Sequence, residues 1–344
     1  MTFKNYLQEQ HKDLLFIYHD FINENTSQKE YIKKHIDDLN DEDVAKVFEI
    51  VNGYIFDWYY KILEKRLPYE AINELKYLFY QVKAPYEEKY ETLKELALNG
   101  IIDEGVFLDK RPGSIFNHLT VKNNFSINLI KELNNSQTKL GKNQYTGSLG
   151  KGELTLLICV KGVRKGKQGE PDLIFKGKGY EVKTGSQKNK GNITYEAKTE
   201  AKLTFDKKIL EKIYKETGII AKEDSKTFTP KKTNFENINK LPPEEISRVA
   251  SLFKKALPKE AQVNFMKNGY FDWDTFIVNI GEVIYKKYKK DLNFDYLMLI
   301  KNTKKDIIIY NITEYYELLE LTNKIDLFFT AKTGAFDLKF NFKV

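Results

Sequence analysis

The first 110 residues of the chain space their apolar side chains as helices do. After Asp41, which is a good N-cap residue type, apolar residues recur every three or four positions over residues 44–62. A second helical pattern covers residues 70–98 and is interrupted near Pro85. We therefore expect residues 1–110 to form an all-helical N-terminal lobe.

The pattern changes to strands from Glu170 onward. The segments DLIF (172–175) and YEVK (180–183) are rich in aliphatic and aromatic residues, as strands are. They flank KGKG (176–179), a connection of hairpin length whose two glycines accommodate positive φ. The sequence therefore predicts a β-hairpin here.

Helical spacing returns over residues 200–290, and further strands follow it. Apolar runs at 296–300 and 307–312 are typical of strands that are buried on both faces. Residues 338–344 alternate apolar and polar side chains, as a half-buried strand does. We expect an α/β (α+β) domain over residues 111–344, in which helices flank a mixed sheet and residues 200–290 form a helical insertion.

The composition excludes several classes of protein. Hydrophobic residues make up 41% of the chain and aromatic residues 14%, which is enough for a packed core. The longest apolar run, LTLLICV at 154–160, is too short to span a bilayer, and the chain does not open with the pattern of a secretory signal. Cys159 is the single cysteine, and we interpret it as a small buried hydrophobe. We expect a soluble cytoplasmic protein, from a bacterium or a phage-infected cell, with no membrane partner.

Charge is divided unevenly along the chain. Residues 1–110 hold 14 basic and 22 acidic residues, a net charge of −8. Because the whole chain has a net charge of +7, the remaining residues have a net charge of +15. Within them, residues 161–190 contain nine basic and three acidic residues. A basic band of this kind is suited to a phosphate backbone, although lysines also keep a glycine-rich hairpin in solution. The candidates for contact with nucleic acid are Lys165, Lys167, Lys188 and Lys190.

The three acids of that band include the candidates for chemistry. Alternation along a strand places Glu181 and Lys183 on one face and Val182 on the other, towards the core, so the first two are expected to face a cleft. The hairpin brings Asp172 towards Glu181, and two converging carboxylates repel each other unless a cation lies between them. With four histidines and one cysteine, a zinc site is disfavoured, and any metal is expected to have oxygen ligands. Mg²⁺, or alternatively Mn²⁺, has this preference and activates water.

The acids of the hairpin also have a purely structural interpretation, and two other candidate motifs are weaker. The same acids could belong to a solvated hairpin and pair with nearby lysines, which contributes little stability. The glycine-rich segment 141–153 lacks the spacing of a phosphate-binding loop. In FDWDTF (271–276), Asp272 is better interpreted as a helix cap than as a metal ligand.

The segments EPD (170–172) and EVK (181–183) resemble the motif of the PD-(D/E)xK nuclease superfamily, which includes many restriction endonucleases. The resemblance implies a restriction-endonuclease-like sheet in which the Asp begins one strand, the acid and Lys lie on the next, and two helices flank the sheet. It implies that Asp172 and Glu181 bind metal and that Lys183 assists the attacking water. Many members have a further Glu on the preceding helix, and Glu153 is the residue here that fits this role as a catalytic and metal-binding residue.

Two departures limit the resemblance. GELTLLICV, which begins at Gly152, is ambiguous between helix and strand, and only a short segment separates it from Glu170. This leaves little room for the family's first strand. Residues 1–140 have no counterpart in the family.

The sequence leads us to expect a divalent-metal-dependent DNA endonuclease. A sequence-specific restriction-type enzyme is one form of this hypothesis, and a structure-specific or nonspecific phage or repair nuclease is another. A non-catalytic nucleic-acid-binding or assembly protein on the same scaffold is the alternative from a different class. RNA as the substrate and a homodimer as the assembly stay open, as does the role of the acidic N-terminal lobe.

Overall fold

A computed structural model of the chain describes residues from Gly53 onward. The gaps within that part are residues 54, 137, 140–147, 151, 168, 189–193, 199–204, 220–221, 224–226, 229, 304, 331–334 and 343–344. The N-terminal part of the helix predicted over residues 44–62 lies outside the described residues, whereas residues 55–64 are helical as expected.

The chain divides into two compact units, and neither is a continuous segment. The first contains the described residues up to Glu104 together with His118–Arg164. The second contains Gly105–Asn117 and Lys165–Val344. The sequence analysis placed a single boundary near residue 110. The structure differs from that expectation, because residues 105–117 belong to the second unit and the chain then returns to the first.

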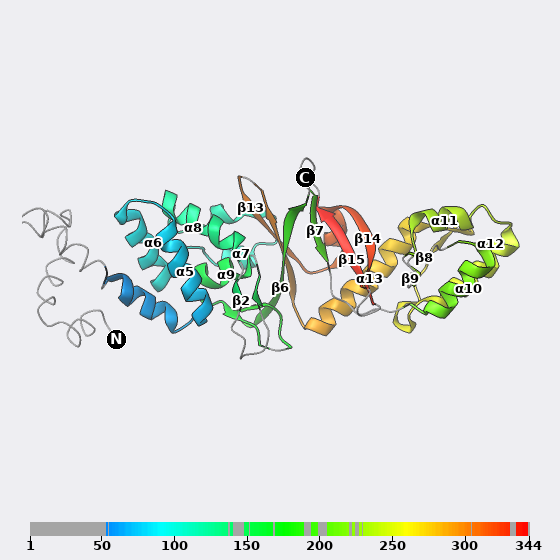
Figure 1. Cartoon of the computed structure of the whole chain (residues 1–344), viewed down its shortest axis with the longest axis horizontal. Coiled ribbons are helices and arrows are strands. Elements are labelled where there is room, and N and C mark those ends of the chain that lie inside the picture. The colour runs from blue at the N-terminus through cyan, green and yellow to red at the C-terminus, as the bar shows by residue number, and fades with distance from the viewer. Residues whose placement is uncertain are drawn as a thin grey trace, which may run out of the picture. The chain divides into compact units, whose positions relative to one another are not determined.

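The first unit consists largely of helices, which are coloured from blue to green in Figure 1. Pro68 and Pro85 each precede a helix, which separates the predicted pattern over 70–98 into two helices. The segment that was ambiguous between helix and strand is a buried helix. The elements of this unit are α5 (Tyr69–Gln81), α6 (Tyr86–Leu98), α8 (Asn124–Asn135), β2 (Thr138–Lys139), β3 (Ser148–Leu149) and α9 (Glu153–Cys159).

Arg66 ties three segments of the first unit together. Its guanidinium donates hydrogen bonds to the carbonyl oxygens of Leu96, Leu157 and Ile158 at 3.1, 3.2 and 2.7 Å. These carbonyls lie near the C-terminal ends of α6 and α9, where helices have unpaired acceptors. Burial lowers the pKa of Arg66, which nevertheless compensates the partial negative charge of both helix ends.

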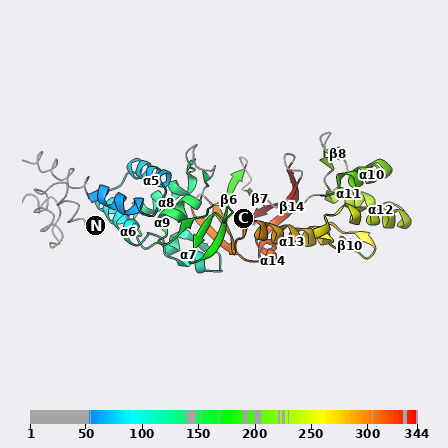
Figure 2. The same ribbon diagram turned by 90° about the horizontal axis from the view of Figure 1, so that it is seen from below.

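The second unit is built on a mixed sheet (Figures 1 and 2). Its strands follow the order β1-β13-β12-β6-β7-β15-β14, and β5 pairs with β6 outside this path. The strand β12 runs parallel to β6, whereas β5, β7 and β13 pair antiparallel with their neighbours. The bounds are β1 (Gly113–Ser114), β5 (Leu173–Phe175), β6 (Lys178–Lys188), β7 (Thr194–Lys198), β12 (Tyr296–Asn302), β13 (Ile307–Ile312), β14 (Thr322–Thr330) and β15 (Ala335–Phe342). Residues 164–165 form β4, a short strand that pairs with β5.

Helices α7 (Gly105–Leu108), α13 (Trp273–Leu292) and α14 (Tyr315–Leu321) accompany this sheet, and η1 (Ile115–His118) follows β1. Asn311 fastens α7 to the sheet, since its Nδ2 donates to the carbonyl oxygens of Val106 and Asp109 at 3.0 Å each. Asp272 begins α13 as an N-cap, and its Oδ1 accepts a hydrogen bond from the Thr275 backbone N–H at 2.7 Å. The interpretation of Asp272 as a helix cap is therefore confirmed.

The predicted insertion at 200–290 consists largely of helices, and its core contains a cluster of aromatic rings. The ring of Phe235 makes edge contacts with Phe253, Phe271 and Trp273 at centroid distances of 5.5, 5.0 and 5.2 Å. Phe276 of α13 packs into the same cluster. The elements are α10 (Lys207–Thr217), β8 (Lys222–Glu223), β9 (Thr227–Phe228), α11 (Lys232–Ile238), α12 (Pro243–Ala256), η2 (Lys259–Ala261), β10 (Met266–Lys267) and β11 (Tyr270–Phe271).

The described part of the chain thus has a mixed α+β fold with a mixed sheet, as the sequence predicts. None of its described helices combines the length and the apolar character that crossing a membrane requires.

Candidate functional site

The predicted β-hairpin is formed by β5 and β6 of the second unit. The last pair before the turn joins Phe175 to Lys178, so the loop contains two residues, Lys176 and Gly177, with φ of 48° and 77°. Positive φ at both loop positions is the backbone of a type I′ turn, whose twist matches that of the strands. The sequence predicted a four-residue connection, KGKG. The connection is shorter in the structure, because Lys178 and Gly179 already belong to β6 and pair with β5.

Gly179 has a different role from the positive φ that the sequence suggested. A Cβ at this position would meet the ring of Pro171 and, at 3.3 Å, the carbonyl oxygen of Asn293. The glycine therefore permits a close approach of three segments at the start of β6. Asp295 strengthens this junction, since its Oδ2 accepts the Gly179 N–H at 2.8 Å.

Asp172 directly precedes β5, one step beyond the pair Leu173–Tyr180, so it lies level with Glu181 in the register. Its Oδ2 accepts a hydrogen bond from the Val182 N–H at 2.9 Å. Its carbonyl oxygen accepts the N–H of Gly166 at 2.9 Å. Asp172 therefore satisfies a backbone donor of β6 at the place where β5 begins, and it lies beside Glu181 in the register.

Glu181 is buried, with 4% of its surface exposed. Its Oε1 accepts a hydrogen bond from the hydroxyl of Tyr288 at 2.7 Å and forms an ion pair with the Nζ of Lys183 at 2.8 Å. The Lys183 side chain is 23% exposed, so the ion pair is partly accessible to solvent on the side of the lysine. The predicted sharing of one face by Glu181 and Lys183 is confirmed by this contact.

Helix α13 explains why Glu181 is buried. Parallel pairing aligns Leu297 with Glu181 and Leu299 with Lys183, so their side chains lie on the same face of the sheet. Both leucines belong to the same buried cluster as Tyr288 of α13. The sequence predicted that Glu181 faces a cleft, and this was wrong, because the tyrosine hydroxyl lies against its carboxylate and only Lys183 of the pair is partly exposed.

Asp172 and Glu181 fit a hard divalent cation in the chemistry of their ligand atoms. Each offers carboxylate oxygens, and Mg²⁺ commonly takes one or two carboxylates together with water and substrate phosphate. Within the described ranges, no group of three or more His, Cys, Asp or Glu side chains could hold a metal ion. The site as described therefore supplies two carboxylates, and Mn²⁺ has the same oxygen preference.

Glu153, the third predicted metal ligand, begins α9 in the first unit. Its Oε1 lies close to the backbone of Gly150, and a Cβ at residue 150 would collide with this oxygen. Gly152, the N-cap of α9, has a φ of +83°, so the turn into this helix depends on glycine. The role of Glu153 in a metal site stays a prediction.

The four lysines proposed for nucleic-acid contact have different surroundings. Lys165 is half-buried and Lys167 is exposed. The backbone N–H of Lys167 donates to Oε2 of Glu170 at 2.8 Å, so Glu170 stabilises a turn. Lys188 is the last residue of β6, its side chain is not described, and Lys190 lies outside the described residues.

Two residues of this face were missed by sequence reasoning. Tyr288 follows the helical spacing of α13, and nothing in the sequence singled it out, since a sequence does not show which group a hydroxyl contacts. Lys301 ends an apolar run, and pairing with Gly185 places it on the face of Lys183. It is 6% exposed, and burial lowers the pKa of its ammonium group. A lysine directly after a buried apolar run was the available signal.

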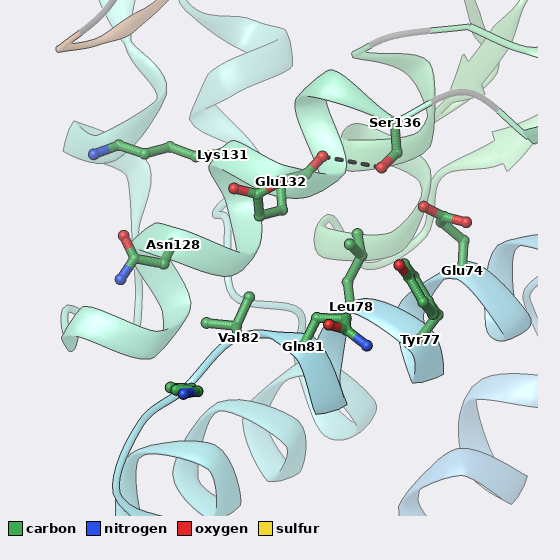
Figure 3. A pocket seen from close by; sticks show the side chains of 10 residues that line it. Glu74, Tyr77, Leu78, Gln81, Val82, Asn128, Lys131, Glu132 and Ser136 are labelled. Atoms are coloured by element: carbon green, nitrogen blue, oxygen red, sulfur yellow. Dashed lines mark hydrogen bonds between the residues drawn. The ribbon is translucent and has the colours of Figure 1, made fainter.

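A separate pocket of about 580 Å³ lies in the first unit (Figure 3). Glu74, Tyr77 and Gln81 of α5 line one side of it, and Asn128 and Glu132 of α8 line the other. Its lining contains none of the sequence-predicted site residues.

Comparisons of the chain with protein-family models, with curated proteins and with solved structures found no match. The assignment of a function therefore depends on the residues and on the geometry of the β5–β6 hairpin.

Proposed function

We propose that the chain is a divalent-metal-dependent endonuclease that hydrolyses phosphodiester bonds in DNA. The observation that carries the proposal is the arrangement on the β5–β6 hairpin: Asp172 level with Glu181, and Lys183 in contact with Glu181 at 2.8 Å. The PD-(D/E)xK resemblance implies this order, with the first Asp at the start of one strand and the acid and Lys on the next. A mixed sheet accompanied by helices also supports a restriction-endonuclease-like fold.

In this proposal, different residues bind the metal ion, orient the attacking water and attract the substrate. Asp172 and Glu181 would hold Mg²⁺, and the bound ion would lower the pKa of a water molecule and offset charge on the phosphate. Lys183 is partly exposed, and its ammonium, which lies 2.8 Å from Glu181, orients the attacking water. Lys301 adds a second positive charge on the same face, which favours an anionic substrate. The proposed setting is the cytoplasm, where the DNA is.

One observation favours a second function from a different class. The Glu181 carboxylate is buried and already has two partners, Lys183 and Tyr288, as a purely structural ion pair would. In this alternative the sheet is a non-catalytic scaffold for nucleic-acid binding or assembly. It predicts binding that is insensitive to chelator, and no cleavage.

The test is incubation of the purified full chain with supercoiled, linear and branched DNA and with RNA, in Mg²⁺ and in EDTA. The proposal predicts cleavage of DNA in Mg²⁺ alone, and discrete bands from mixed DNA would indicate sequence specificity. Cleavage confined to branched DNA or an unselective digest would indicate the other nuclease form. Binding without cleavage in either condition would favour the scaffold.

A further inference from the structure

The hydroxyl of Tyr288 lies against a single atom of the proposed site. It donates to Oε1 of Glu181 at 2.7 Å, and the ammonium of Lys183 lies 2.8 Å from the same oxygen. Both recorded contacts are made at Oε1, and the hydroxyl donates to this oxygen rather than to Oε2. A carboxylate that is fixed through one oxygen by two donors has its rotation about the terminal bond restricted, and its other oxygen is left for a different partner.

The surroundings of Tyr288 keep its hydroxyl in place. The residue is 1% exposed, and its ring makes an edge contact with Phe294 at a centroid distance of 5.2 Å. Tyr288 also lies on α13, a helix of 20 residues whose first turns pack into the aromatic cluster of the insertion through Phe276. The position of the hydroxyl is therefore set by packing on the sheet and along the helix.

We propose that Tyr288 is a positioning residue for the divalent cation: it holds Glu181 through Oε1 so that Oε2 is the oxygen that binds the ion. This inference rests on the proposed function, because it concerns the same carboxylate. Groups that support a metal ligand typically change metal affinity about 10- to 100-fold when they are removed. The hydroxyl of Tyr288 is such a group for Glu181.

The chain offers a matched control in Tyr285, which lies one turn earlier on the same helix. It is equally buried, it packs against the same Phe294, and its hydroxyl donates to the carbonyl oxygen of Ile312 at 3.4 Å rather than to Glu181. Tyr288→Phe and Tyr285→Phe each remove one buried hydroxyl and keep the ring. Only the first removes a donor from the proposed ligand.

The experiment measures Mg²⁺ and Mn²⁺ affinity by titration calorimetry for the wild type and both variants, with the melting temperature of each as a check on folding. Tyr288→Phe is expected to weaken cation affinity about tenfold or more, whereas Tyr285→Phe leaves it within about twofold of the wild type. Equal affinities for the two variants would overturn the role of Tyr288 and leave the nuclease proposal standing.

Two further results keep the outcomes distinct. If Tyr288→Phe fails to fold, 3-fluorotyrosine placed at position 288 or at position 285 replaces it, because this residue keeps the ring and the hydroxyl while its fluorine resonance reports on the surroundings. A shift of the resonance on Mg²⁺ addition at position 288 and not at position 285 supports the inference, and equal responses at the two positions overturn it. A wild type that binds neither cation overturns both this inference and the proposed function.

Discussion

The ion pair between Glu181 and Lys183 makes a quantitative prediction about stability, and its two ends are not equivalent. Removing Lys183 leaves a carboxylate that is only 4% exposed with the Tyr288 hydroxyl as its remaining donor. Removing Glu181 leaves an ammonium on a side chain that is already 23% exposed and can extend into water. The first change should therefore cost more than the second.

Breaking a buried pair by deleting one partner costs about 3–5 kcal/mol, so we expect a loss near 3–4 kcal/mol for Lys183→Ala. For Glu181→Ala, solvation of the freed lysine reduces the loss to roughly 1–3 kcal/mol. The double variant should cost less than the sum, with a coupling energy of at least about 1 kcal/mol for groups in direct contact.

Urea denaturation measures these losses, and the chain provides a suitable reporter. Its two tryptophans are Trp58 in the first unit and Trp273 in the second, so a Trp58→Phe background leaves a single fluorophore in the unit that contains the ion pair. Additivity of the two single changes within about 0.5 kcal/mol would refute the pair, and so would a greater loss for Glu181→Ala than for Lys183→Ala.

Three further predictions concern the hairpin and the first unit. Asp172→Ala should lower stability by about 1 kcal/mol because it removes the acceptor of the Val182 N–H, whereas Asp172→Asn, which keeps an acceptor, should cost less; urea denaturation compares them, and equal losses would contradict the hydrogen bond. Gly179→Ala should cost about 1–3 kcal/mol through collision with Pro171 and the Asn293 carbonyl, against little change for exposed Lys178→Ala in the same thermal melt, and a harmless Gly179→Ala would contradict the close approach. Burial raises the pKa of the Cys159 thiol to about 12, so at pH 8 the folded state holds the unreactive thiol and a thiol reagent should modify it only at the rate of unfolding; rapid modification of folded protein would show that Cys159 is accessible.

Local signals made much of the fold predictable. Pro68 and Pro85 cannot continue a preceding helix, so the starts of α5 and α6 follow from single residues. The hairpin follows from Gly177 and from the apolar residues on both sides of it, because turn geometry is decided over a few positions. The placement of Glu181 and Lys183 on one face follows from alternation along one strand.

Contacts between distant residues were beyond this reasoning. Tyr288 meets Glu181 across 107 positions of the chain, and nothing in either segment specifies the partner. The return of residues 105–117 to the second unit depends on the pairing of Gly113 and Ser114 with Ile309 and Ile308 of β13. The burial of Glu181 likewise follows from how α13 packs on the sheet, which the helical spacing of α13 does not determine.

The most direct test of the central claim is the initial rate at which Asp172→Asn cleaves supercoiled plasmid in Mg²⁺, compared with Asp295→Asn. Both variants remove one negative charge near the hairpin and keep the acceptors of a backbone N–H, of Val182 or of Gly179. If Asp172 and Glu181 bind the catalytic ion, Asp172→Asn should be at least about 100-fold slower, because weakening a ligand costs no less than removing a group that supports one, while Asp295→Asn cleaves like the wild type. Equal rates for the two variants, or cleavage by the wild type that persists in EDTA, would contradict the claim.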